Sequence, residues 1–145
     1  MAETLGTLSD KLTIVKLKQW HSEDDARLES LARQEIQLQD EINEFIAAAV
    51  AGSIPPERLT FAANKVYKKE GNEIRDVEGS LGEIFSALAE VNCKLWHVQE
   101  TVYDFEAIPV DEKDQVIKEL AILNLERNQC IDQMDRTFTS LLDPV

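Results

Sequence analysis

Apolar residues recur every three or four positions along most of the chain, and the pattern is clearest between residues 81 and 105. Two sets of apolar residues, each spaced by seven positions, interleave there: Leu81, Leu88, Leu95 and Val102, and Ile84, Val91, Val98 and Phe105. This spacing predicts a long helix that buries one face against neighbouring helices. Ser80 and Glu83 predict its first turn as a capping box, and Pro109 predicts its end.

Another long helix is predicted near the C-terminal end, over residues 112–142, with Asp111 as its cap. Its apolar stripe consists of Ile117, Leu120, Leu123, Cys130, Ile131, Met134, Phe138 and Leu141. Asn124 and Arg127 interrupt this stripe, so we expect polar contacts in the interior there.

The N-terminal third predicts two further helices. One covers about residues 4–21 and is apolar over a broad arc, formed by Leu5, Leu8, Leu12, Ile14, Val15, Leu17 and Trp20. The other stops at Gly52 and has a narrower stripe of Leu28, Leu31, Leu38, Ile42, Phe45 and Ala49, in which Glu35 takes an apolar position. A broad apolar arc must be covered on more than one side, by neighbours or by a second subunit. We therefore expect a homodimer that pairs through the first helix.

No Gly or Pro separates these two N-terminal helices. A break near Ser22 is predicted, because the apolar phase jumps between Val15 and Leu28 and because Ser22 with Asp25 resembles a helix start. The alternative is one bent helix of more than about forty residues, which is long for a globular helix.

A crossover separates the two halves of the chain. Gly52 and Pro55-Pro56 precede a short predicted helix at about residues 57–69, and a polar link follows from Gly71. The sequence therefore predicts one all-α domain over residues 1–145: a four-helix bundle of two duplicated hairpins, residues 5–51 and 80–142, joined by a crossover at 52–79.

The duplication is visible as a repeat with an offset of 76 positions, as in Leu5 and Leu81. The segment Leu5-Gly6-Thr7-Leu8 recurs as Leu81-Gly82-Glu83-Ile84, and both tryptophans and both histidines match, as Trp20-His21 and Trp96-His97. Rare residues seldom match in this way by chance. We therefore expect the two Trp-His segments to occupy equivalent positions in the two hairpins.

The formal net charge of −13 limits the kinds of partner. Such a surface repels phosphate backbones, so we expect no nucleic-acid binding. Lys65, Lys68 and Lys69 form a basic cluster, which suits the C-terminal end of the short helix. No apolar run approaches the roughly 18 residues of a membrane span, so we expect no membrane partner. The first residues lack the basic and apolar regions of a secretory signal, so a cytoplasmic location is expected.

The two cysteines show no metal or redox spacing. Cys93 matches Leu17 under the repeat and Cys130 lies on an apolar stripe, so both are expected to be buried and unreactive. Gly-rich phosphate loops and Gly-x-Ser-x-Gly elbows are absent. Cys93 and His97 are four positions apart, a common coincidence on helices. We therefore predict no catalytic residue and no cofactor.

The Trp-His segments still suggest a metal site. His21 with Asp24, and His97 with Glu100, are His-x-x-acid pairs that share one helix face. With Glu35 in a stripe, these residues are candidates for a divalent metal site inside a bundle. Dimetal bundles use more acids and a Glu-x-x-His order that this chain lacks. The alternative is that both tryptophans pack at the bundle edge while the histidines face water.

The polar residues of the stripes suggest two further possibilities. A buried Arg127 needs a carboxylate, and Asp10 and Glu35 are the candidates. Such a contact most often sets the register of helices, as a polar core residue does in coiled coils. The alternative is a small-molecule site for an anionic aromatic or sugar ligand. Its candidate residues are Trp20, His21, Trp96, His97, Asn124, Arg127 and Asn128.

Four segments carry a resemblance to a known family. They are the stretch from Leu5-Gly6 to Trp20-His21, then Asn64-Lys65-Val66-Tyr67, then Leu88 to His97 with its Asn92-x-x-Leu95-Trp96, and finally Asn124-Leu125-Glu126-Arg127-Asn128-Gln129-Cys130-Ile131-Asp132. In this order they resemble a family of bacterial proteins known only as a domain of unknown function. Ser9 replaces an apolar residue of that family, and Gln99, Thr101 and Tyr103 stand where two acids and a basic residue are usual. The resemblance implies a helical fold and a bacterial source, and it brings no established activity.

These observations favour a non-catalytic scaffold that presents an acidic, helical surface to a protein partner or to a second copy of itself. The competing hypothesis is a small metal-binding or ligand-binding protein, or an enzyme, that uses the duplicated Trp-His segments.

Overall fold

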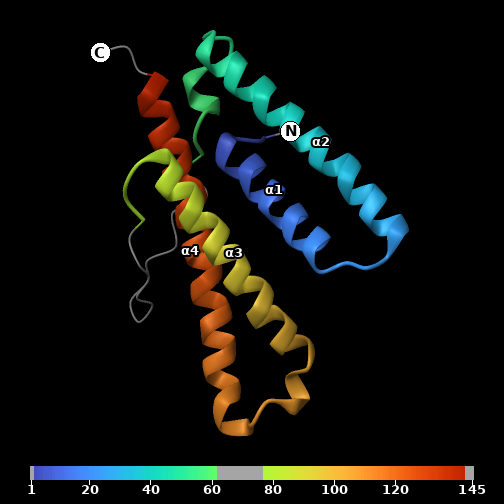
Figure 1. The fold of residues 1–145 in the computed structure, drawn as a ribbon. Helices are drawn as coiled ribbons and strands as arrows, with labels where there is room; N and C mark the ends of the chain where they lie inside the picture. The colour runs from blue at the N-terminus through green and yellow to red at the C-terminus, as the bar shows by residue number, and fades with distance from the viewer. Residues whose placement is uncertain (1, 62–76, 143–145) are drawn as a thin grey trace.

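The structure is a computed structural model and describes residues 2–61 and 77–142. Within these residues it is an all-α four-helix bundle, as the sequence predicts (Figure 1). The helices are α1 (Leu5–Trp20), α2 (Asp25–Val50), α3 (Leu81–Tyr103) and α4 (Val110–Leu142), with short 3₁₀ turns η1 (Pro56–Arg58) and η2 (Phe105–Ala107).

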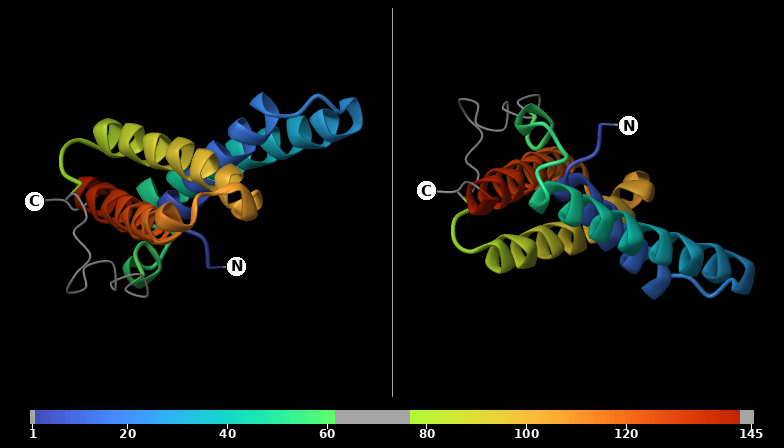
Figure 2. Two further views of the ribbon diagram at one scale, coloured as in Figure 1. Left: turned by 90° about the horizontal axis from the view of Figure 1, so that it is seen from below. Right: turned by 90° about the horizontal axis from the view of Figure 1, so that it is seen from above.

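The bundle consists of two antiparallel hairpins that cross each other. Helices α1 and α2 form one hairpin, and α3 and α4 form the other (Figure 1). Helix α1 lies against both α3 and α4, whereas within the described residues α2 makes extensive contacts with α1 alone. Figure 2 shows that the first turns of α2 extend away from the α3–α4 pair. Helix α1 is therefore the central element of the molecule.

The core lies where α3 and α4 meet and where α1 closes over them. Its fully buried side chains include Ile84 and Leu88 from α3 and Met134 and Cys130 from α4. Leu5, at the start of α1, belongs to the same cluster. Because three helices cover α1, much of its apolar arc is buried within the chain. Less of this arc is therefore left for a second subunit to cover, and the homodimer through this helix stays a prediction.

The predicted break between the first two helices is confirmed, but its cap is different. Helix α1 ends at Trp20, so the single bent helix is wrong. The side chain of Asp24 caps α2 by accepting a hydrogen bond from the N–H of Ala26 at 3.1 Å, whereas Ser22 was expected to do so. The negative charge of Asp24 is also favoured there by the positive end of the helix dipole.

At the second hairpin the predicted start is confirmed. The hydroxyl of Ser80 accepts a hydrogen bond from the N–H of Glu83 at 3.3 Å and donates one to the carboxylate of the same residue at 3.1 Å. Helix α4 begins at Val110, so Asp111 lies in its first turn and does not cap it, contrary to the prediction.

The crossover is described only in part. Residues 57 and 58 belong to the 3₁₀ turn η1, and no helix follows up to Phe61. The rest of the predicted helix at residues 57–69, including the basic cluster and the segment at residues 64–67, lies outside the described residues. Leu59 and Val77, on either side of that gap, are buried in the core.

Candidate functional site

The two Trp-His segments occupy different positions. Trp20 is the last residue of α1 and its side chain is 87% exposed, whereas Trp96 lies two turns before the end of α3 and is half-buried. The expectation of equivalent surroundings is therefore wrong. The segments do meet, because the ring of His21 stacks on that of Trp96, with ring centroids 4.7 Å apart. Nδ1 of His21 also lies 2.8 Å from the carbonyl oxygen of Leu17.

The repeated glycines differ as well. Gly6 lies against α4, and a Cβ atom there would be 2.6 Å from the carbonyl oxygen of Ile131. Gly82, its match in α3, has open space at the same position. The cysteines separate in the same way: Cys130 is buried as expected, but Cys93 is exposed, which contradicts the prediction. The repeated segments therefore both begin helices, but their surroundings in the fold differ.

The five candidate metal ligands do not come together. The carboxylate of Glu35 accepts hydrogen bonds from Lys16 at 2.7 Å and from Gln19 at 3.3 Å, and the bond from Lys16 lowers its pKa. Glu100 accepts a hydrogen bond from the indole Nε1 of Trp96 at 2.8 Å.

The remaining three candidates have other surroundings. Asp24 caps α2, His21 stacks on an indole, and His97 is exposed on α3. Across the part of the chain that the structure describes, no group of three or more His, Cys, Asp or Glu side chains is placed to hold a metal ion.

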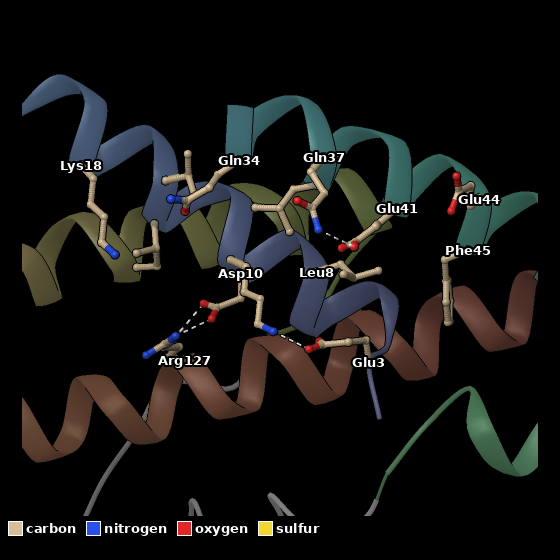
Figure 3. A pocket seen from close by; sticks show the side chains of 14 residues that line it. Glu3, Leu8, Asp10, Lys18, Gln34, Gln37, Glu41, Glu44, Phe45 and Arg127 are labelled. Carbon is tan, nitrogen blue, oxygen red and sulfur yellow. Dashed lines mark hydrogen bonds and ion pairs between the residues drawn. The ribbon is translucent and has the colours of Figure 1, made fainter. Parts of the chain in front are cut away.

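Arg127 is half-buried and has a carboxylate partner. Its Nε donates to Oδ1 of Asp10 at 2.8 Å, and its Nη2 donates to Oδ2 of the same carboxylate (Figure 3). The hydrogen bonds to Asp10 raise the pKa of Arg127. Asp10 is only 4% exposed, so this two-point contact holds a buried negative charge. Of the two predicted partners, Asp10 is confirmed and Glu35 is wrong.

A third helix joins this contact through Asn92, which the sequence reasoning missed. Nδ2 of Asn92 donates to Asp10 at 2.9 Å and to the hydroxyl of Thr13 at 2.7 Å. Asn92 is 1% exposed, beside the apolar seam of α3. A buried amide within a seam is a signal for such a network. Asn124, by contrast, is exposed and bonds to the Leu120 carbonyl of its own helix, so it does not belong to the interior.

A second buried polar contact links α1 to α4. Oδ1 of Asp135 accepts a hydrogen bond from the N–H of Gly6 at 2.7 Å. Burial raises the pKa of Asp135 to about 6, and the nearby charge of Asp132 adds to the shift, while hydrogen bonds from Thr4 and Gly6 oppose it. The sequence contained little indication that Asp135 would be buried, because acidic residues on a long helix usually face water.

A groove of about 820 Å³ is lined by α1 and α2, and by Arg127 of α4 (Figure 3). Its apolar lining comes from Leu8, Ile14, Val15, Leu38 and Phe45. Lys18 and Arg127 lie at one end in the view of Figure 3, and Glu44 lies at the other end, beside Phe45. The groove thus has apolar walls and oppositely charged ends.

A second, smaller cleft of about 550 Å³ shares Ile14, Lys18 and Arg127 with this groove. Three of the seven ligand-binding candidates line it, namely Trp96, Asn124 and Arg127. The other four, Trp20, His21, His97 and Asn128, do not, although His21 supports the ring of Trp96. The sequence also failed to indicate that Lys18 and Arg27 contribute to this cleft.

Comparisons with known proteins found nothing similar to this chain. No protein-family model, curated protein or solved structure matches it. The resemblance to a bacterial family of unknown function stays a prediction. Across residues 2–61 and 77–142, no helix has both the length and the apolar character that crossing a membrane would need.

Proposed function

We propose that this protein is a non-catalytic interaction module that binds an amphipathic helix of another protein in the groove between α1, α2 and α4. The groove itself is the observation that supports this most. Helices α2 and α4 both pack on α1, and the space between them stays open over about 820 Å³. A further helix placed there would complete the packing around α1.

The lining of the groove suits the apolar stripe of a helix. Leu38 and Phe45 of α2 are only half-buried, and so is Ile14 of α1. Helix-binding grooves use such apolar walls to receive side chains spaced at three and four positions. Covering these residues would remove apolar area from water, which favours binding.

The charges at the two ends of the groove favour one direction of the bound partner helix along it. Glu41 and Glu44 line one end, together with Phe45, and Lys18 lines the other. A matching helix would carry basic residues where it meets Glu41 and Glu44, and an acidic residue near Lys18. The net charge of −13 would also attract a basic partner over longer distances.

Site-specific photo-crosslinking in a cell lysate tests this proposal. A photoreactive side chain at Gln34, which lines the groove, is compared with one at Glu29, an exposed position of the same helix. We expect Gln34 alone to capture a protein whose cross-linked segment is a basic, amphipathic helix. A synthetic peptide of that segment should bind the purified chain, and Glu44→Lys should weaken this binding about tenfold.

Two results would overturn the proposal. Capture of the same proteins from Glu29 and Gln34 would show that contact is not specific to the groove. A captured segment whose peptide binds wild type and Glu44→Lys equally would show that the charged end takes no part.

The competing hypothesis, a metal-binding protein, has less support. His21, His97 and Glu35 have separate surroundings and form no common group. Elemental analysis and thermal melts with and without chelator address it directly. Stoichiometric metal, with a Tm that falls on chelation, would favour this hypothesis over the interaction module.

A further inference from the structure

The smaller cleft, of about 550 Å³, has a charge that is unusual for this molecule. Lys18 of α1, Arg27 of α2 and Arg127 of α4 all line it. No Asp or Glu is among its lining residues in the described structure, although the chain has 28 acidic and 15 basic residues. Three helices thus bring cations together at one place on an acidic protein.

Two of these cations are available to a ligand. Arg127 is engaged by Asp10, but Lys18 and Arg27 have no ion-pair partner among the described residues. Glu100, one residue beyond the lining residue Gln99, is engaged by the indole of Trp96. An unpaired lysine and an unpaired arginine on different helices form a site for an anion.

A buried hydrogen-bond acceptor in the cleft indicates that the ligand also carries a donor. Asn92 lines the cleft and is 1% exposed, and its Nδ2 already serves Asp10 and Thr13. Its Oδ1 is buried and has no hydrogen-bond partner. A buried carbonyl oxygen without a donor costs on the order of 1–3 kcal/mol, so a donor is favoured there. A ligand hydroxyl would supply one.

The remaining walls fit a carbon skeleton. Trp96 and Tyr103 contribute aromatic surface, and Trp96 is held by the ring of His21 on its face and by Glu100 at its Nε1. The cleft volume falls in the range of about 300–1,000 Å³ that small-molecule sites occupy. The ring is therefore fixed before a ligand arrives.

We infer that this cleft binds a small hydroxylated organic anion. Its phosphate or carboxylate group would contact Lys18 and Arg27, a hydroxyl would donate to Oδ1 of Asn92, and its carbon atoms would lie against Trp96. The cleft shares Ile14, Lys18 and Arg127 with the helix-binding groove, whereas Arg27, Asn92 and Trp96 line the cleft and not the groove.

Fluorescence titration of a Trp20→Phe variant tests the inference. The chain has two tryptophans and Trp20 is 87% exposed, so this variant leaves Trp96 as the reporter without touching the core. The probes are glucose 6-phosphate, gluconate, inorganic phosphate and uncharged glucose, at one ionic strength. We expect saturable binding of glucose 6-phosphate or gluconate, and at least tenfold weaker binding of glucose.

The probes distinguish the two possible anionic groups. Preference for glucose 6-phosphate assigns a phosphate ligand, and preference for gluconate assigns a carboxylate ligand. Inorganic phosphate should bind more weakly than glucose 6-phosphate if phosphate is preferred, because it cannot reach Asn92 and Trp96 together. Equal binding of glucose and both anions, or no saturable signal from any probe, would overturn the inference.

Matched charge variants complete the test. Arg27→Gln and Lys18→Gln, each on the Trp20→Phe background, should weaken binding of the preferred anion about tenfold. Arg33→Gln is the control, because Arg33 also lies on α2, is exposed and pairs with Glu29 in a surface contact. Both arginine variants remove one charge from the same helix. If Arg33→Gln weakens binding as much as Arg27→Gln, general electrostatics explains the signal and the cleft is not the site.

Discussion

Asp135 is the buried carboxyl whose protonation the fold changes most clearly. It is 3% exposed, and burial raises its pKa from 3.8 to about 6. The folded state thus disfavours its ionised form. The stability that this group contributes is complete below pH 3.8 and is lost as pH rises through 6.

A pH series of denaturant unfolding checks this consequence. Between pH 5 and pH 7 the raised pKa of Asp135 should lower the free energy of unfolding of the wild type by about 1 kcal/mol. In Asp135→Asn this part of the pH dependence should be absent, because the amide oxygen still accepts the hydrogen bond of Gly6 but does not ionise. Identical pH dependence in the two proteins would show that another group is responsible.

Gly6 and Gly82 offer a matched comparison between the two helix starts. Gly6→Ala would place a Cβ atom 2.6 Å from a backbone oxygen of α4, which cannot move aside easily. We expect a loss of roughly 1–3 kcal/mol in the free energy of unfolding. Gly82→Ala meets no atom within 4 Å, and the better helix propensity of alanine should add roughly 0.5 kcal/mol. Equal effects in unfolding experiments would contradict the asymmetry of the hairpins.

Among the secondary-structure elements, the turn between α1 and α2 depends on Asp24. Asp24→Ala removes the acceptor for the N–H of Ala26, and we expect a loss of about 1 kcal/mol. Ser22→Ala is the control two residues earlier, with an expected change of a few tenths of a kcal/mol. Thermal melts of both variants measure the difference. A larger effect at Ser22 would restore the cap that the sequence first suggested.

The helices themselves were largely predictable, because each carries its own start signal and apolar spacing. Ser80 before α3 and the phase jump before Leu28 are local features, and local features can be read from one sequence. Side-chain exposure was less predictable. Cys93 and Asn124 lie at the edge of their stripes, where a rotation of the helix by part of a turn decides between core and solvent.

At the level of the whole molecule, Asp10 connects the two hairpins. Its carboxylate on α1 accepts hydrogen bonds from Asn92 of α3 and from Arg127 of α4. Polar contacts of this kind fix how helices are aligned, since a shifted alignment would leave a charge buried without a partner. The register role predicted for Arg127 is consistent with this geometry.

A double-mutant cycle tests how strongly the pair is coupled. Arg127→Met should cost roughly 3 kcal/mol, because it leaves the charge of Asp10 buried with Asn92 as its remaining donor from another helix. Asp10→Asn combined with Arg127→Met should cost less than Arg127→Met alone, since the double variant removes that charge. Denaturant unfolding of the four proteins gives the coupling free energy. Costs that simply add would show that the two residues act independently.

The candidate sites were less predictable than the helices, because they depend on contacts between distant parts of the chain. Arg127 was expected to find a carboxylate, since an unpaired buried charge is costly. Nothing in the sequence indicated that Lys18 and Arg27 would share a cleft with it, because their meeting depends on how the hairpins cross. The same crossing separates the candidate metal ligands.

The crossing also has a consequence for local opening of the native state. The first half of α2 is attached to the molecule mainly through α1, and Leu31 is its one buried side chain. Segments with few buried contacts unfold at a lower free energy than the core that they leave behind. Amide hydrogens in the first turns of α2 should therefore exchange with solvent well before those of Leu88 or Met134, so that this arm can unwind and refold while the α3–α4 core stays intact.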